Sequence, residues 1–286
     1  MSTGRAADGL PRPGTAGGRA GLEALASAPA QALIATDYDG TLAPIVSDPA
    51  AAYVHPAAIT ALRRLAGSVG TLAVITGRPA AQAVELGGLA SVPGLIVLGH
   101  YGWERWAAGR TAAPATPPGV AEARRELPGL LRAAGAPDGT RTEDKGYALA
   151  VHTRGTADPD AALARLRGPL QALAERVGLA VEPGRRVIEL RPPGMDKGVA
   201  LRELTAERAA RSVMFCGDDL GDLPAFAAVR ALRAAGIPGC AVASASAESP
   251  QVAAAADLVV NGPDGIVALL AAIAGRLGPG DGPGAG

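Results

Sequence analysis

The chain has 286 residues, of which 48% are hydrophobic, and this is enough to build the core of one large domain or of two modest ones. Lys plus Arg and Asp plus Glu both number 27, so the net charge is near zero, and a surface specialised for nucleic acid or for membrane lipid is not expected. The two cysteines, Cys216 and Cys240, are too few for a disulfide framework, which favours a cytoplasmic protein.

Both ends of the chain are rich in residues that do not build packed elements. The first 27 residues hold many Gly, Pro and Arg, have no apolar run of signal-peptide length, and are predicted to form a disordered leader. Gly278–Gly286 is mostly Gly and Pro and is predicted to be a flexible tail. No segment between them has the length and hydropathy of a membrane span.

Short apolar runs that end at acidic, polar or glycine residues recur along the chain, as in buried parallel strands. Such strands are expected at Ala32–Thr36, Leu72–Ile75, Ser212–Cys216 and Leu258–Val260. Helical patterns lie between them, at Ala57–Ala66, Pro79–Leu86, Lys197–Arg208 and Gly265–Ala274. This alternation predicts an α/β fold with a doubly wound parallel sheet, formed by residues 28–109 and 194–277.

The middle of the chain, residues 110–193, breaks this alternation. It opens on a segment rich in Pro and Ala, and the patterns at Tyr147–His152 and Arg186–Arg191 indicate half-exposed strands. Ala161–Val177 has the pattern of an amphipathic helix. We therefore expect a smaller α+β domain inserted into the larger one.

The first expected strand runs into the acidic loop Asp37-Tyr38-Asp39-Gly40-Thr41. Two carboxylates two positions apart can share one metal ion while one attacks phosphorus and the other moves a proton. Gly40 lets the chain turn, and Thr41 can cap the turn or offer a hydroxyl. Asp and Gly after a strand are also ordinary turn residues, so the loop alone leaves both interpretations open.

A second acidic cluster, Gly217-Asp218-Asp219-Leu220-Gly221-Asp222, follows the third expected strand. Three carboxylates so close together repel one another unless they are solvated or neutralised, and a hard cation with oxygen ligands would neutralise them. The alternative is a solvated acidic turn in which Asp222 caps the helix that begins at Leu223.

Two further segments can hold phosphate. Thr76-Gly77-Arg78-Pro79 ends the second strand and opens a helix, where a hydroxyl and backbone N–H groups suit phosphate oxygens. Lys197 at another helix start can add a positive charge, although a solvated lysine is the ordinary alternative. Together with the two acidic loops, these segments would meet at one edge of the sheet, where such sheets place their sites.

These motifs, in this order, resemble those of haloacid dehalogenase-like phosphatases: Asp37–Leu42, Thr76-Gly77-Arg78, Lys197-Gly198 and Gly217–Asp222. Within that superfamily the chain resembles the trehalose-6-phosphate phosphatases from about Ala32 to Leu270. The segments that carry this closer resemblance are Asp37–Pro44, Gly99–Glu104, Glu143–Gly146, His152–Arg154 and Glu189–Pro192. Tyr101 and Thr153 depart from the family pattern, as does Gly221-Asp222-Leu223 in place of Thr-Asp-Glu.

The resemblance implies a reaction and a role for each matching residue. Asp37 would form an aspartyl-phosphate, Asp39 would protonate the leaving sugar and then activate water, and Thr76 and Lys197 would hold the phosphoryl oxygens. It implies Mg²⁺ bound by Asp37, the backbone carbonyl of Asp39 and Asp218, with Asp219 and Asp222 as further carboxylates. It implies substrate contacts from Gly40, Thr41, Gly77 and Arg78, and sugar contacts in the inserted cap domain from Glu143, Lys145, Arg154 and Glu189.

The expected substrate is trehalose 6-phosphate in the last step of trehalose biosynthesis, and a trehalose-6-phosphate synthase is a possible partner. Sucrose phosphate and a mannosyl phosphoglycerate stay open as alternative substrates, because the core motifs alone do not choose among sugar phosphates. A non-catalytic domain that binds trehalose 6-phosphate would be free to lose Asp37, Asp39 or Lys197, yet all three are present. A dinucleotide-binding enzyme is disfavoured, because no G-x-G-x-x-G follows the first strand.

Overall fold

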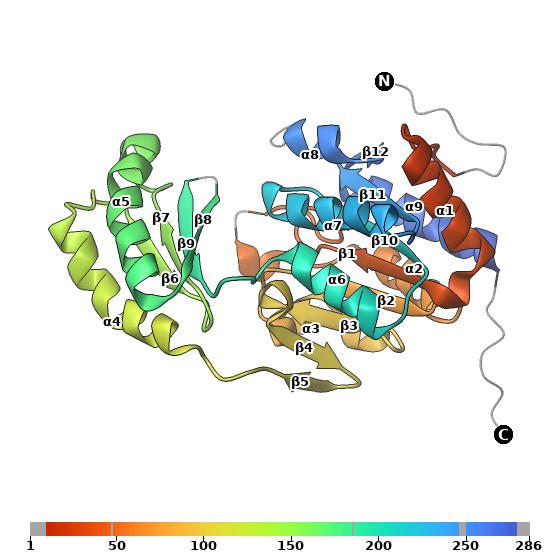
Figure 1. Ribbon diagram of the computed structural model, residues 1–286, viewed down its shortest axis with the longest axis horizontal. Helices are drawn as coiled ribbons and strands as arrows, with labels where there is room; N and C mark the ends of the chain where they lie inside the picture. The colour runs from red at the N-terminus through yellow and green to blue at the C-terminus, as the bar shows by residue number, and fades with distance from the viewer. Residues whose placement is uncertain (1–9, 47, 185, 246–249, 279–286) are drawn as a thin grey trace. The chain divides into compact units, whose positions relative to one another are not determined.

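The computed structural model describes residues 10–46, 48–184, 186–245 and 250–278, and the chain forms two compact units (Figure 1). The first unit is Met1–Ala113 with Asp196–Gly286, and the second is Pro114–Met195. The second unit is thus an insertion into the first. Its boundaries differ by a few residues from the predicted limits of 110 and 193, because residues 110–112 extend the sheet of the first unit.

The first unit is built on one eight-stranded sheet in the order β12-β11-β10-β1-β2-β3-β4-β5. The six strands from β12 to β3 run parallel, and β4 and β5 are antiparallel additions at the edge. The strands are β1 (Ala32–Thr36), β2 (Thr71–Ile75), β3 (Ile96–Gly99), β4 (Glu104–Ala107), β5 (Arg110–Ala112), β10 (Ser212–Gly217), β11 (Gly239–Ser244) and β12 (Leu258–Val260). All four strands expected from apolar runs are present.

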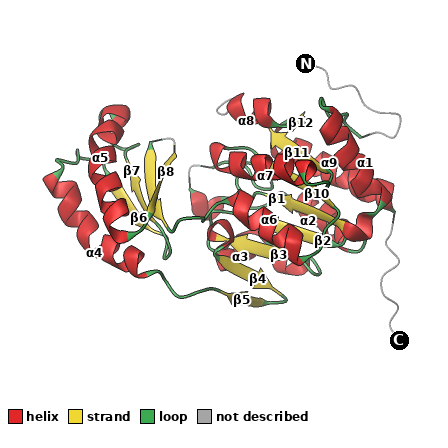
Figure 2. Ribbon diagram, in the orientation of Figure 1, coloured by secondary structure: helices red, strands yellow, loops and turns green. Residues whose placement is uncertain are grey.

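Helices cover both faces of this sheet, which confirms the doubly wound architecture (Figure 2). One face packs against α1 (Ala16–Ser27), α2 (Pro56–Ala66), α3 (Ala80–Gly87) and α9 (Gly262–Leu277). The other packs against α6 (Lys197–Glu207), α7 (Leu223–Ala234) and α8 (Pro250–Ala255). None of the described helices is long and apolar enough to cross a membrane.

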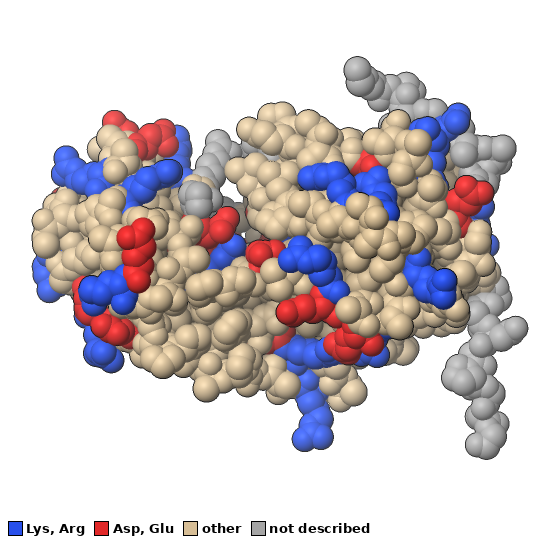
Figure 3. Space-filling model, viewed as in Figure 1, with Lys and Arg blue, Asp and Glu red and all other residues tan. Residues whose placement is uncertain are grey.

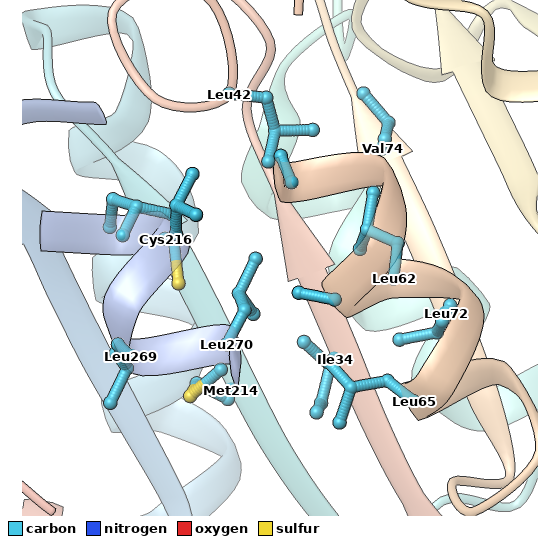
Figure 4. Packing of buried hydrophobic residues seen from close by; sticks show 14 of the residues in the cluster. Ile34, Leu42, Leu62, Leu65, Leu72, Val74, Met214, Cys216, Leu269 and Leu270 are labelled. Carbon is cyan, nitrogen blue, oxygen red and sulfur yellow. The ribbon is translucent and has the colours of Figure 1, made fainter. Parts of the chain in front are cut away.

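Most side chains in the core of the first unit are aliphatic, as the scarcity of aromatic residues requires, and Tyr38, Phe215 and Phe226 are buried among them. Figure 4 shows Leu62 and Leu65 of α2 and Leu270 of α9 packed over Ile34 of β1 and Met214 of β10. Full burial of such a side chain contributes about 1.5–3 kcal/mol, so this layer holds the strands that carry the acidic loops in place.

Helix α1 corrects the prediction that residues 1–27 form a disordered leader. The Thr15 hydroxyl accepts a hydrogen bond from the Gly18 N–H, and Leu25 is buried in the core. A Cβ on Gly21 would lie 2.3 Å from the backbone of Gly239, so the glycine lets the helix approach β11 closely. Tertiary packing thus outweighs the low helix propensity of glycine. Residues 1–9, and residues 279–286 of the predicted tail, lie outside the described residues.

The second unit is a four-stranded antiparallel sheet with two helices, the expected α+β arrangement. Its strands run in the order β6-β7-β9-β8, with β6 (Arg141–Asp144), β7 (Leu149–His152), β8 (Ala180–Gly184) and β9 (Val187–Arg191). Its helices are α4 (Pro118–Ala133) and α5 (Pro159–Val177), which pack on Leu149, Val151, Ile188 and Leu190. The predicted half-exposed strands β7 and β9 are the central ones, so most of their side chains are buried.

Candidate active site

The loop after β1 is held rigidly at the carboxyl edge of the parallel strands. The backbone N–H of Asp37 donates to the carbonyl of Cys216 at 2.8 Å, and its side chain is buried. The carbonyl of Gly40 accepts a hydrogen bond from the Ser244 hydroxyl at 2.7 Å. Gly40 has a φ of 72°, and a Cβ there would lie 2.1 Å from a carboxylate oxygen of Asp218. Only glycine fits this position.

Lys197 lies between two buried carboxylates. Its Nζ is 2.8 Å from Oδ1 of Asp37 and 2.7 Å from Oδ1 of Asp222. Burial disfavours its charge, but Asp222 and Asp37 outweigh that effect and raise the pKa of Lys197 well above its usual value. The ordinary alternative of a solvated lysine is therefore wrong, since only 3% of Lys197 is exposed.

The second acidic loop is shaped by Asp222, which ends the short 3₁₀ helix η5 (Leu220–Asp222). Its Oδ2 accepts hydrogen bonds from the backbone N–H groups of Asp218 at 2.8 Å and Asp219 at 3.1 Å. Its side chain does not cap α7, as the alternative interpretation assumed, but forms a capping box with Asp219 in η5. Asp222 is fully buried, which contradicts a solvated turn at this residue.

One carboxylate oxygen from each of Asp37, Asp219 and Asp222 lies within 4.8 Å of the other two. Burial, more than the neighbouring carboxylates, raises the pKa of Asp37 well above its usual value and the pKa of Asp218 to about 8. Closely spaced carboxylates whose negative charge is disfavoured by burial can bind a hard divalent cation such as Mg²⁺, because the cation neutralises that charge. Asp218 lies outside this group and accepts a hydrogen bond from the Thr41 hydroxyl at 3.2 Å.

Among the described residues, the hydrogen bonds that join the segment after β2 to the acidic loop come from Arg78. Arg78 donates from Nε to Oδ2 of Asp39 at 2.7 Å and from a terminal nitrogen to Oδ1 at 2.6 Å. Thr76 is buried, and its hydroxyl oxygen accepts a hydrogen bond from the Arg78 backbone N–H at 3.2 Å, which leaves its O–H free to donate. Gly77 packs against Tyr101, so close that a Cβ there would lie 2.8 Å from the Tyr101 hydroxyl.

Several supporting residues were missed by sequence reasoning. Asp196 accepts from the N–H groups of Gly198 and Val199, both at 2.8 Å, and so sets the start of α6 at Lys197. Glu104 accepts from the N–H of Ala80 at 2.7 Å, at the start of α3. The Asp directly before the Lys197 helix is an N-cap signal that could have been used. Ser244 carries no such local signal.

The four candidate sugar residues lie in the second unit. Lys145 Nζ is 2.9 Å from Oε2 of Glu189, and Glu143 is 2.9 Å from Nε2 of His152. Glu143 and Glu189 both lie opposite Ala150 in the sheet register, so they share the face that points away from α4 and α5. The other oxygen of Glu189, Oε1, is buried without a hydrogen-bond partner among the described residues.

Arg154, the fourth candidate sugar residue, differs in exposure from its neighbour Thr153. Arg154 is exposed in the loop after β7. Thr153 is fully buried, and its hydroxyl donates to the carbonyl of Pro159 at 2.9 Å, so its departure from the family pattern serves the packing of the loop.

Comparisons with known proteins agree with this geometry. A family model described as trehalose-phosphatase matches residues 35–264. A trehalose-phosphate phosphatase from Mycobacterium marinum is 37% identical over 204 residues, which cover 68% of this chain and 50% of that protein. An uncharacterized glycosyl hydrolase from Mycobacterium tuberculosis is 38% identical over 208 residues, 68% of this chain and 15% of that protein. The chain thus spans half or less of these curated relatives.

Solved structures show the same fold. A C-terminal domain of a trehalose-6-phosphate phosphatase from C. albicans superposes with a TM-score of 0.71 at 22% identity, over 93% of this chain and 99% of that chain. A trehalose-6-phosphate phosphatase from Aspergillus fumigatus superposes with a TM-score of 0.68 at 24% identity, over 92% of this chain and 99% of that chain.

Proposed function

The chain belongs to the trehalose-phosphatase family, and on this premise we propose that it hydrolyses trehalose 6-phosphate to trehalose and inorganic phosphate with Mg²⁺ as its cofactor. The observation that carries the proposal is the buried row of Asp37, Lys197 and Asp222 at the carboxyl edge of the sheet. Buried groups whose pKa values are strongly shifted by burial and by specific partners are characteristic of active sites.

In the first proposed step, a carboxylate oxygen of Asp37 forms a bond to phosphorus while the bond from phosphorus to the sugar oxygen breaks. The sugar oxygen leaves with a proton from Asp39. The Thr76 O–H and the Lys197 ammonium, which already contacts Asp37 at 2.8 Å, hold the phosphoryl oxygens. Fixed donors at developing negative charge are worth more in a water-poor site than in water.

In the second step, water attacks phosphorus and gives a proton to Asp39, and the bond from phosphorus to Asp37 breaks. Inorganic phosphate forms and the Asp37 carboxylate is restored. Asp39 thus acts first as an acid and then as a base, and it ends the cycle with the proton that it had at the start.

The oxygen cluster supports the cofactor assignment. Asp37, Asp219 and Asp222 are the residues that would hold Mg²⁺, while Asp218 and the Asp39 carbonyl stay predictions from the resemblance. When bound, the cation would mask the negative charge of the phosphate. An unmasked phosphate would repel the attacking carboxylate. We expect excess EDTA to stop phosphate release and added Mg²⁺ to restore it. Activity that persists after complete metal removal would contradict the cofactor assignment.

A panel of phosphate esters tests the substrate. We expect kcat/KM for trehalose 6-phosphate to exceed that for glucose 6-phosphate by about 10²-fold or more, because specific recognition of hydroxyl groups discriminates strongly. Sucrose phosphate and a mannosyl phosphoglycerate belong in the same panel as the alternative substrates. If trehalose 6-phosphate is no better than glucose 6-phosphate, this substrate is wrong and the phosphatase chemistry stands. No release from any ester would favour a binding domain.

Two finer predictions from the sequence also stay proposals. They are the trehalose-6-phosphate synthase partner, which no comparison supports, and the cytoplasmic location.

A further inference from the structure

Asp39 and Arg78 form a two-point ion pair beside the nucleophile. Both oxygens of the Asp39 carboxylate accept hydrogen bonds from Arg78, at 2.7 and 2.6 Å. Paired parallel N–H donors of this kind are the strongest and most directional contact that an arginine makes with a carboxylate. The pair joins the loop after β1 to the loop after β2.

Each of the three nitrogens of the Arg78 guanidinium group donates a hydrogen bond within the protein. Its remaining terminal nitrogen donates to the carbonyl of Pro49 at 2.9 Å, and its central carbon lies 5.2 Å from the centre of the Tyr38 ring. Its side chain is only 10% exposed, whereas that of Asp39 is 41% exposed. Arg78 therefore faces the protein and Asp39 faces outward. This geometry favours a role for Arg78 through Asp39 over the phosphate contact expected from the sequence.

The pairing also fixes where the Asp39 carboxyl group lies. Two contacts from a planar, rigid guanidinium group leave the carboxyl group little freedom to turn, so Arg78 determines the direction that its oxygens face. A group that moves a proton must lie within hydrogen-bond reach of the atom that gains or loses it, so a fixed Asp39 suits the attack of water on phosphorus.

We propose that Arg78 is a positioning residue that holds Asp39 as the base for hydrolysis of the aspartyl-phosphate. This inference rests on the proposed function, because it assumes that Asp37 is phosphorylated. In the step that Arg78 serves, water forms a bond to phosphorus and loses a proton to Asp39, and the bond from phosphorus to Asp37 breaks. Arg78 contributes no proton and touches no substrate.

The test uses p-nitrophenyl phosphate, because its leaving group departs without needing a proton from Asp39. In Arg78→Gln we expect the first equivalent of p-nitrophenol to be released at close to the wild-type rate, followed by a steady state about 10–100-fold slower. The phosphorylated enzyme should accumulate and be detectable by mass spectrometry of the quenched protein. Arg78→Lys, which keeps one charge but loses the paired geometry, should fall between wild type and Arg78→Gln.

Arg105→Gln is the matched control, because it removes an arginine that makes a paired contact with Glu207 elsewhere in the same unit. It should leave both phases at the wild-type rates. Thermal unfolding of each variant separates loss of folded protein from loss of rate, and if Arg78→Gln does not fold, the test rests on Arg78→Lys.

A double-mutant cycle decides whether Arg78 acts through Asp39. In the Asp39→Asn background, Arg78→Gln should slow the steady state by no more than about twofold, since its partner is already changed. Three results would overturn the inference: a raised KM with a slower first phase, which indicates a phosphate contact; the full slowing by Arg78→Gln in the Asp39→Asn background; or an Arg78→Gln variant equal to wild type. Wild-type turnover of p-nitrophenyl phosphate without turnover of trehalose 6-phosphate would instead refute the proposed substrate alone.

Discussion

Asp37 and Lys197 share one buried corner of the first unit, and their opposite charges give their substitutions opposite consequences for stability. Burial is the largest cause of the raised pKa of Asp37; Lys197 lowers this pKa, and the carboxylates of Asp222, Asp218 and Asp219 each raise it further. Removing a negative charge from this corner relieves repulsion. Removing the positive charge leaves buried carboxylates without compensation.

Asp37→Asn should abolish turnover without loss of stability. The change is nearly isosteric, it removes the proposed nucleophile, and it takes one carboxylate out of the cluster. We expect phosphate release from trehalose 6-phosphate to fall by on the order of 10³-fold or more. The melting temperature of the metal-free variant should equal or exceed that of wild type. Turnover near the wild-type rate would contradict the proposed mechanism.

Lys197→Met should be inactive and also less stable. It leaves Asp37 and Asp222 buried without their shared partner, a change that typically costs about 3–5 kcal/mol. Urea unfolding of the metal-free protein measures the loss. The control is Arg105→Gln, which breaks a partly exposed pair and should cost no more than about 1 kcal/mol. Equal losses of the free energy of unfolding in the two variants would show that the buried row of Asp37, Lys197 and Asp222 contributes no more to stability than a partly exposed ion pair.

The acidic loops also predict a pH dependence of stability. Burial, with the nearby Asp222 and Asp219, raises the pKa of Asp218 to about 8, whereas the pKa of an aspartate in the unfolded chain is about 3.9. Between these values the folded state binds more protons than the unfolded state, so the free energy of unfolding falls as pH rises. This group should therefore lower the melting temperature in EDTA progressively from about pH 5 to 8.

Magnesium should oppose that decrease, because a cation held by Asp37, Asp219 and Asp222 would favour the charged form of the nearby Asp218. The rise in melting temperature on adding Mg²⁺ should be larger at pH 8 than at pH 6. A gain in melting temperature that is largest at low pH would be inconsistent with carboxylate ligands.

At the scale of elements, the parallel strands β1, β2, β10 and β12 were predicted because each is an apolar run that ends at a polar loop. The parallel strands β3 and β11 were not predicted, although they are buried in the same way. Strands β4 and β5 were not predicted either, since they lie toward the sheet edge, where the side chains of β4 are mostly half-buried, those of β5 are exposed, and the apolar signal is weak. Their turn has positive φ values at Ala108 (49°) and Gly109 (77°), a short hairpin that the sequence marks only by its glycine. Helix α1 was missed because tertiary packing stabilises it, whereas its glycine-rich sequence has a low helix propensity.

Gly40→Ala tests how strictly the first loop is built. The substitution would place a Cβ 2.1 Å from Asp218 Oδ2 and would also strain a backbone at φ 72°. We expect kcat to fall by about 10²-fold or more, because small displacements of reacting groups are costly, and stability to fall by more than the roughly 1–2 kcal/mol of the backbone strain alone. Kinetics and urea unfolding measure the two effects.

Gly88→Ala is the matched control for this loop, because Gly88 has a φ of 59° but no atom within 4 Å of the added Cβ. The free energy of unfolding of Gly88→Ala should fall only by the cost of the backbone strain, and its kcat should equal that of wild type. Two variants with the same loss of activity would show that the clash with Asp218 is unimportant.

At the scale of the whole molecule, acidic and basic side chains are interspersed on the face shown in Figure 3, in keeping with the balanced composition. The sequence predicted which strand ends carry the site residues, since parallel strands bring their carboxyl ends to one edge. The sequence did not predict which side chains these residues contact through hydrogen bonds and ion pairs. Arg78 pairs with Asp39 and Lys197 bridges Asp37 and Asp222, and these choices depend on loop conformations that no periodicity encodes.

The two units have separate cores, so the chemistry and the choice of sugar should be separable by mutation. Lys145→Met removes the partner of Glu189 on the sheet face that carries the candidate sugar residues. We expect KM for trehalose 6-phosphate to rise about tenfold or more, since a lost charged contact typically costs more than 1 kcal/mol. Turnover of p-nitrophenyl phosphate should stay at the wild-type rate, because that ester offers no sugar hydroxyls.

Arg124→Gln provides the control for Lys145→Met within the same unit. Arg124 on α4 pairs with Asp144, which neighbours Glu143 in β6 and points to the opposite, helix-covered face. Arg124→Gln should leave kcat and KM unchanged for both trehalose 6-phosphate and p-nitrophenyl phosphate. If the two variants raise KM for trehalose 6-phosphate equally, the effect comes from the stability of the second unit. If Lys145→Met slows both esters equally, the second unit acts on the chemistry and not on the choice of sugar.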